Sequence, residues 1–159
     1  MKHSLPITVA ALGLALLSSQ ANAQGNALLF DGDDDLVSVM NTSSDFNLAG
    51  AFTIEAWVQV DAANSCGSFV SGRTPFGGMT WALTGGFSSP TTAQFAVSVP
   101  STDSVSASGA IVPGPIWKHF AGTYDGALMS IYLDGVLVAQ SPHSTSGNST
   151  SVGQLFVGR

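Results

Sequence analysis

Four carboxylates occur within five positions of the stretch LFDGDDDLVSV, residues 29–39. They are Asp31, Asp33, Asp34 and Asp35. Calcium takes oxygen ligands of this kind, and the alternating aspartates match the start of an EF-hand loop. However, Leu36 stands where that loop needs glycine, and Thr42 stands where it needs a bidentate glutamate. An EF-hand is therefore excluded, which leaves either another kind of calcium site or a solvated acidic turn.

Acid–base catalysis has little support in the sequence. Hydrolysis of a glycosidic bond uses two carboxyl groups on either side of the bond. Glu55 is the only glutamate of the chain, and the segment EAWVQ that follows from it holds no second carboxylate. There is also no G-x-S-x-G nucleophile elbow. We therefore predict that the protein is not an enzyme.

A further set of candidate functional residues consists of aromatic residues beside polar ones. Glu55 and Trp57 lie in FTIEAWVQV, His119 in WKHFAG and Tyr132 in LMSIYLD. Sugar rings bind to aromatic faces supported by a few polar groups, so these four residues are our candidate ligand-binding residues. The alternative is that the tryptophans are capped by loops and only serve packing.

These residues lie in segments whose sequence patterns predict β-strands. Phe52 to Val60 alternates apolar and polar residues with period two, which would place Glu55 and Trp57 on the face opposite Ile54 and Val58. Clusters of Gly, Ser, Thr, Asn and Pro separate such runs, and we expect loops at Ser101–Ser108 and Ser141–Ser151. We predict an all-β, antiparallel, two-sheet jelly-roll sandwich. The other expected strands are Leu36–Met40, Phe69–Ser71, Thr80–Leu83, Gln94–Val99, Lys118–Tyr124, Leu128–Leu133, Val136–Gln140 and Leu155–Val157.

Two Asp-Gly pairs divide the stretch YDGALMSIYLDGVLVA. Asp125-Gly126 and Asp134-Gly135 each separate two strand-like runs, and Asp-Gly readily adopts the positive φ values of a tight hairpin turn. The stretch therefore predicts a meander of three consecutive antiparallel strands.

The N-terminus and the charge restrict the class of protein. Residues 1–23 have a basic start, an apolar run and the cleavage pattern Ala21-Asn22-Ala23, so we expect a signal peptide followed by one domain over residues 24–159.

The chain has four basic and ten acidic residues, and loss of Lys2 leaves a net charge of 3 − 10 = −7. This charge disfavours nucleic acid and anionic lipid as partners. Cys66 is the only cysteine, which leaves either a buried residue or an intermolecular disulfide.

The order of four motifs carries a family resemblance. ALLFDGDDDLVSV, FTIEAWVQV, WKHFAGTYDGALMSIYLDGVLVA and LFVGR resemble laminin-G-like jelly-roll domains of the concanavalin A-like lectin and glucanase group. The resemblance implies a calcium near the first strand, with Asp31, the Gly32 carbonyl and Asp33 or Asp34 as ligands. Asp35 is expected to be solvated. The family usually continues past the LFVGR strand, so we expect the domain to lack its final strand or strands.

These observations lead to one expected function with two alternatives. We predict a secreted, periplasmic or cell-surface binding module without catalytic activity. Its partner would be a glycan or an extracellular protein, with calcium as a supporting ion. The alternatives are a structural or adhesion module of a longer surface protein and a degenerate glucanase-like hydrolase.

Overall fold

The computed structural model describes residues 27–31, 33–43, 45–48, 50–60, 67–85, 91–98, 102–143 and 152–158. The expected signal peptide, Gly32 and Cys66 lie outside these residues. All regular secondary structure in the described ranges is β-strand, as the period-two alternation predicts. We find no helix in these ranges that is long and apolar enough to cross a bilayer.

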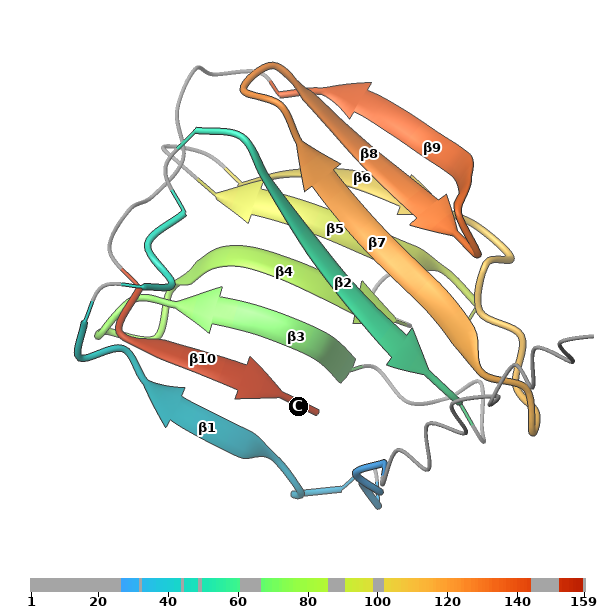
Figure 1. The fold of residues 1–159 in the computed structure, drawn as a ribbon, viewed down its shortest axis with the longest axis horizontal. Coiled ribbons are helices and arrows are strands. Elements are labelled where there is room, and N and C mark those ends of the chain that lie inside the picture. The colour runs from blue at the N-terminus through green and yellow to red at the C-terminus, as the bar shows by residue number, and fades with distance from the viewer. Residues whose placement is uncertain are drawn as a thin grey trace, which may run out of the picture.

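The strands form two antiparallel sheets that pack face to face (Figure 1). The larger sheet has the order β1 (Val37–Met40), β10 (Gln154–Val157), β3 (Gly67–Arg73), β4 (Met79–Gly85), β5 (Ala93–Ser98) and β6 (Thr102–Ala107). The smaller sheet has the order β2 (Phe52–Val58), β7 (Lys118–Tyr124), β8 (Leu128–Leu133) and β9 (Val136–Pro142). This arrangement confirms the predicted two-sheet sandwich.

The core lies between the two sheets and consists of alternate residues of the facing strands. Phe120 and Ile131 come from the smaller sheet, while Leu83 and Phe95 come from the larger one, and all four are at most 1% exposed. Gly122 lies opposite Phe95, where an added Cβ would be within 2.9 Å of three atoms of the Phe95 ring. A glycine at this position therefore allows the two sheets to approach closely.

Strand β6 corrects one prediction. The Ser- and Thr-rich residues 101–108 were expected to form a loop, yet Thr102–Ala107 pairs with β5 over its whole length. Val105 is buried, and the amide of Gln94 donates hydrogen bonds to the hydroxyls of Ser104 and Ser106 across the strand pair. The prediction was wrong because serine favours loops locally, whereas pairing with a distant strand decides this segment.

The predicted meander is confirmed. Strands β7, β8 and β9 are consecutive in the smaller sheet. Asp134 and Gly135 have φ values of 50° and 80°, which is the pattern of a type I′ turn. At the other turn, the carboxylate of Asp125 accepts hydrogen bonds from the backbone N–H groups of Ala127 and Leu128, and Gly126 has φ 102°.

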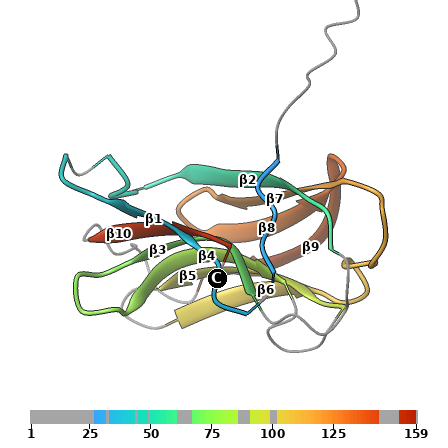
Figure 2. The same cartoon turned by 90° about the horizontal axis from the view of Figure 1, so that it is seen from below.

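The chain before β1 runs across one open side of the sandwich (Figure 2). We call residues 27–31 and 33–36 the N-terminal segment. Phe30 packs against Gly158 near the end of β10, where an added Cβ would be within 2.5 Å of three ring atoms. The segment also lies near the last residues of β2, so it reaches both sheets.

Candidate functional site

The four aromatic and polar candidate residues share one face of the smaller sheet. The pairing of β2 with β7 sets Trp57 opposite His119 and Glu55 opposite Ala121, and the pairing of β7 with β8 sets Ala121 opposite Tyr132. Residues that alternate along a strand share a face, so all four side chains lie away from the core. We call Glu55, Trp57, His119 and Tyr132 the aromatic face.

His119 connects two other members of the aromatic face. Its Nε2 lies 3.4 Å from Oε2 of Glu55, and its ring lies 5.2 Å from the Trp57 ring between centroids, at a tilt of 46°. Residue Trp57 is 64% exposed, while the side chain of His119 is 21% exposed. The imidazole therefore supports an indole whose surface remains open to solvent.

Asp134 holds the end of β7 that carries His119. Its Oδ1 accepts a hydrogen bond from the backbone N–H of His119 at 3.0 Å, and its Oδ2 lies 2.7 Å from Nζ of Lys118. The hydrogen bond from Lys118, followed by that from the His119 backbone, holds the pKa of Asp134 below its ordinary value. This carboxylate is thus ionised and fixes the turn beside the aromatic face.

Tyr132 is the most separate member of the aromatic face. It lies on β8, with Ala121 between it and Glu55. Ala121 is only 7% exposed although it points outward, so its neighbours cover it. Farther along the same face, Gln140 donates a hydrogen bond to the hydroxyl of Ser130 at 2.9 Å. The face combines aromatic surface with hydrogen-bonding groups, which is the chemistry needed to hold a sugar.

The acidic stretch folds into a compact loop. Carboxylate oxygens of Asp31, Asp34 and Asp35 lie within 4.8 Å of one another, and we call these residues the acidic triplet. Asp33, which the sequence also suggested, is not part of this group, and Gly32 is outside the described residues. Asp35, expected to be solvated charge, is exposed but belongs to the triplet.

Hydrogen bonds within the loop explain this arrangement. The backbone N–H of Asp31 donates to Oδ2 of Asp35 at 3.1 Å, and the backbone N–H of Asp33 donates to Oδ1 of Asp31 at 2.9 Å. The bond from Asp33 is the main reason that the pKa of Asp31 lies below its ordinary value, because it favours the charged carboxylate. Asp33 therefore contributes its backbone to the loop.

A groove separates the N-terminal segment from the end of β2. It has a volume of about 730 Å³. Its walls include Leu28, Leu29, Val58, Val60, Phe69 and Trp117, and it also borders Trp57 and all four aspartates of the acidic stretch. The sequence offered one signal for this feature, the apolar residues before Asp31, but did not show that they would face β2.

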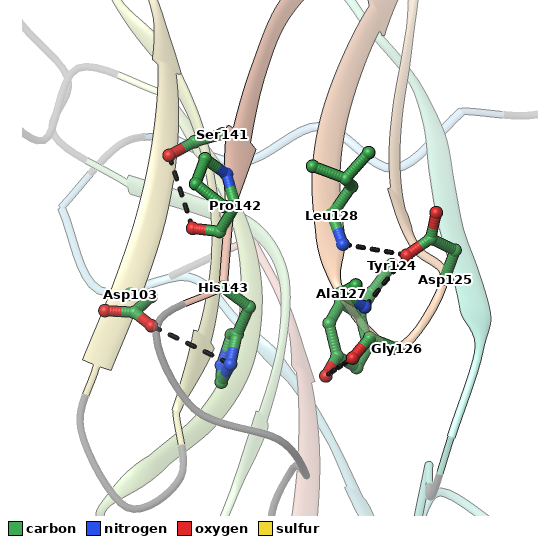
Figure 3. A network of polar contacts seen from close by, with 9 residues as sticks. All are labelled: Asp103, Tyr124, Asp125, Gly126, Ala127, Leu128, Ser141, Pro142 and His143. Atoms are coloured by element: carbon green, nitrogen blue, oxygen red, sulfur yellow. Dashed lines mark hydrogen bonds and ion pairs between the residues drawn. The ribbon is translucent and has the colours of Figure 1, made fainter.

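A second polar network lies at the other side of the sandwich (Figure 3). The buried ring of His143 lies 5.3 Å from the ring of Tyr124 between centroids, and its Nδ1 is 3.7 Å from Oδ2 of Asp103. The Tyr124 hydroxyl donates to the Gly126 carbonyl at 2.9 Å. Sequence reasoning missed this cluster. Asp103 belongs to β6 and His143 follows β9, so the cluster connects the two sheets where β6 contacts β9.

Several solved structures are similar to this fold. Among solved structures, the binding domain of botulinum neurotoxin serotype C1 superposes with a TM-score of 0.56 at 17% identity, over 77% of this chain and 31% of that one. Domains LG4-5 of the mouse laminin alpha1 chain give a TM-score of 0.50 at 13% identity, over 69% and 28% of the two chains. This chain thus spans less than a third of either structure. No curated protein matches its sequence.

A match to a protein-family profile identifies the family of this chain. The profile Laminin_G_3, described as the concanavalin A-like lectin/glucanases superfamily, matches residues 31–159. The match begins at the first residue of the acidic triplet and includes all ten strands found in the described residues. The resemblance seen in the four sequence motifs is therefore confirmed, and the chain belongs to the laminin-G-like family of the concanavalin A-like superfamily.

Proposed function

We propose that this chain is an exported, non-catalytic binding module that holds a glycan on its aromatic face. The family and its structural neighbours support a binding module in general. The observation that carries the finer proposal is Trp57, which is 64% exposed and whose indole lies beside His119, which in turn contacts Glu55. An open indole next to a carboxylate and an imidazole offers a sugar both a flat surface and hydrogen-bonding partners.

Glycan-array binding followed by affinity gel electrophoresis tests this proposal. Trp57→Ala and Tyr132→Ala should each weaken binding, and the tryptophan variant should lose about tenfold or more, which is about 1.4 kcal/mol. Phe76→Ala is the matched control, because Phe76 is 99% exposed between β3 and β4 and outside the aromatic face. Binding that is unchanged in both Trp57→Ala and Tyr132→Ala would reject the aromatic face as the sugar site.

The charges of the aromatic face support a function without catalysis. Glycoside hydrolysis needs two carboxyl groups, one of them free to give or take a proton. Glu55 contacts His119, and Asp134 is bonded to Lys118 and to the His119 backbone. A glucanase-like activity would require Glu55, so hydrolysis of β-glucans that is lost in Glu55→Gln would contradict the proposal.

We further propose that calcium binds the acidic triplet and supports the loop. Calcium lies 2.3–2.6 Å from its oxygen ligands, so two ligands on opposite sides of the ion can be about 5 Å apart. The 4.8 Å limit between the carboxylate oxygens of Asp31, Asp34 and Asp35 fits one such ion. When bound, the ion would neutralise charge repulsion within the triplet, while Asp33 holds Asp31 in place through its backbone.

Calorimetric titration with calcium, together with melting curves, tests the metal proposal. The full chain should release heat and melt at a higher temperature in millimolar calcium, and Asp34→Asn should remove both effects. Asp45→Asn is the control, because Asp45 is an exposed aspartate that lies outside the triplet and bonds the hydroxyl of Ser43. The absence of heat and of a melting shift in the unaltered chain would reject a calcium site.

The location of the protein is part of the same proposal. The basic start, apolar run and Ala21-Asn22-Ala23 pattern of the first 23 residues support export. N-terminal sequencing of the exported protein should begin at Gln24. A protein that retains Met1 to Ala23 in the cytoplasm would contradict this part of the proposal.

A further inference from the structure

The outer face of the smaller sheet is arranged in three rows that cross its strands. Trp57 lies opposite His119 in one row, and Glu55, Ala121 and Tyr132 lie side by side in the next. The third row, which we call the polar row, holds one polar residue from each strand: Thr53, Thr123, Ser130 and Gln140. Neighbouring rows are two residues, or about 7 Å, apart along the strands. The aromatic face is therefore bordered on one side by a continuous line of hydroxyl and amide groups.

Trp57 and Tyr132 stand far enough apart to contact different sugar rings. They lie on β2 and β8, with β7 between these strands, and Trp57 belongs to the row beside that of Tyr132. Two strand spacings and two residues along the strand separate their Cα atoms by about 12 Å. Apolar groups touch only when their heavy atoms are within about 4–4.5 Å. Because the Trp57 ring packs against His119 within its own row, each aromatic side chain offers a stacking surface of its own.

The polar row can hydrogen-bond to a ligand over the width of the sheet. Its end residues Thr53 and Gln140 are exposed, while Ser130 is buried and accepts a hydrogen bond from Gln140 at 2.9 Å. Hydroxyl and amide groups both donate and accept hydrogen bonds, as sugar hydroxyls do. A chain of several sugar units has hydroxyls along its whole length, so it matches a row of such groups better than a single sugar does.

The charges of this face select against acidic glycans. The side chain of Glu55 is 66% exposed on it, and the whole chain has a net charge of −6. Lys118 is the only lysine or arginine on the four described strands of this sheet, and its Nζ lies 2.7 Å from Oδ2 of Asp134. A uronic acid or a sulfated sugar would be repelled by Glu55, and the one lysine already has a carboxylate partner. The ligand that fits is therefore uncharged.

This face does not depend on the edge of β2 being unpaired. A further strand beside β2 would lie in the plane of the sheet, about 4.8 Å away, whereas outward side chains project from that plane. The sheet would become wider, and the three rows would stay on its outer surface. The acidic triplet precedes β1 and contributes no residue to the rows.

We propose that the ligand of the aromatic face is an uncharged, extended, β-linked glycan chain that crosses β2, β7 and β8. This inference rests on the function proposed above and specifies the ligand of the same site. Trp57 would stack on one sugar unit and Tyr132 on another, while the polar row binds hydroxyls along the chain. Equatorial β-1,4 links keep a glucan chain straight, so several of its units can lie on one sheet face.

Calorimetric titration of the full chain with β-1,4-linked glucose oligosaccharides of one, two, four and six units tests the length of the ligand. Affinity should rise at least tenfold between two and four units. Tyr132→Ala should remove this gain and leave the weak binding of the short sugars, whereas Tyr132→Phe keeps the ring and should keep the gain. Phe76→Ala, outside the sheet face, is the control. Equal affinity for all lengths, a full gain in Tyr132→Ala, or no binding of the six-unit sugar at millimolar concentration would overturn the proposal.

Affinity gels with two soluble β-1,4-glucans test the charge of the ligand. One polymer carries hydroxyethyl groups and the other carboxymethyl groups. At low salt the uncharged polymer should bind at least tenfold more tightly, and added salt should narrow the difference. Glu55→Gln should narrow it too, whereas Asp45→Asn, which removes one charge from the exposed loop between β1 and β2, should not. Equal or tighter binding of the carboxymethyl polymer would refute an uncharged ligand.

The outcomes separate this inference from the function on which it rests. Glycan binding that depends on Trp57 but is as tight for single sugars or for acidic glycans would keep the aromatic face as a sugar site and refute the extended, uncharged ligand. Glycan binding that depends on neither Trp57 nor Tyr132 would instead reject the sugar site itself.

Discussion

Gly122 offers a sharp test of the packing between the two sheets. An alanine in the middle of a strand normally stabilises a protein by about 0.5–1 kcal/mol relative to glycine, because glycine loses more backbone freedom on folding. At position 122 we expect the opposite sign. The added Cβ would lie within 2.9 Å of three ring atoms of Phe95, whereas ordinary contacts are 3.4–4 Å, and Phe95 is fully buried.

The size of the effect follows from the two opposing contributions. Overpacking of a well-packed core costs about 1–3 kcal/mol. The short contacts with the fully buried Phe95 ring place this substitution in the upper half of that range. The gain in backbone entropy offsets part of this cost, which leaves a net destabilisation of about 1–2 kcal/mol for Gly122→Ala. A domain of this size shifts in melting temperature by about 4 °C per kcal/mol, so the variant should melt about 4–8 °C lower.

Urea unfolding and thermal melting of the full chain measure this effect. Gly78→Ala is the control, because Gly78 is exposed and its added Cβ would meet only the side chain of Thr74, at 3.3 Å and beyond. The control should stay within about 0.5 kcal/mol of the unaltered chain. If Gly122→Ala is as stable as the unaltered chain or more stable, the close approach of β7 and β5 at this point is wrong.

Three other predictions concern stability. Phe120→Ala should cost about 3–5 kcal/mol in urea unfolding because Phe120 is buried, whereas Phe76→Ala should cost almost nothing because that ring is 99% exposed. The pKa of Asp134 is lower in the folded protein than in the unfolded chain, so the ionised carboxylate stabilises the fold. This contribution is complete above the ordinary pKa of 3.8 and is lost as the pH falls through the folded value. Asp134→Asn should therefore weaken the dependence of the unfolding free energy on pH at the acid end. Gly135→Ala should lower the melting temperature measurably, because φ is 80° there, and leave the pH dependence unchanged.

The parts of the fold that depend on local sequence could be predicted. The alternation in FTIEAWV correctly predicted that Ile54 faces the core and Trp57 faces solvent, because strand geometry alone assigns alternate residues to opposite faces. The Asp134-Gly135 turn was also predictable, since few residue pairs adopt positive φ at both positions. The sharing of one face by Trp57 and His119 followed from the same alternation once β2 and β7 were neighbours.

The parts that depend on distant contacts could not be predicted. Strand β6 is rich in serine and becomes a strand through its pairing with β5 and the burial of Val105. The acidic triplet includes Asp35 because the Asp31 backbone bonds to its carboxylate, a loop conformation that the residue types do not specify. The groove beside β2 depends on the path of the N-terminal segment across the sandwich, which no periodic pattern encodes.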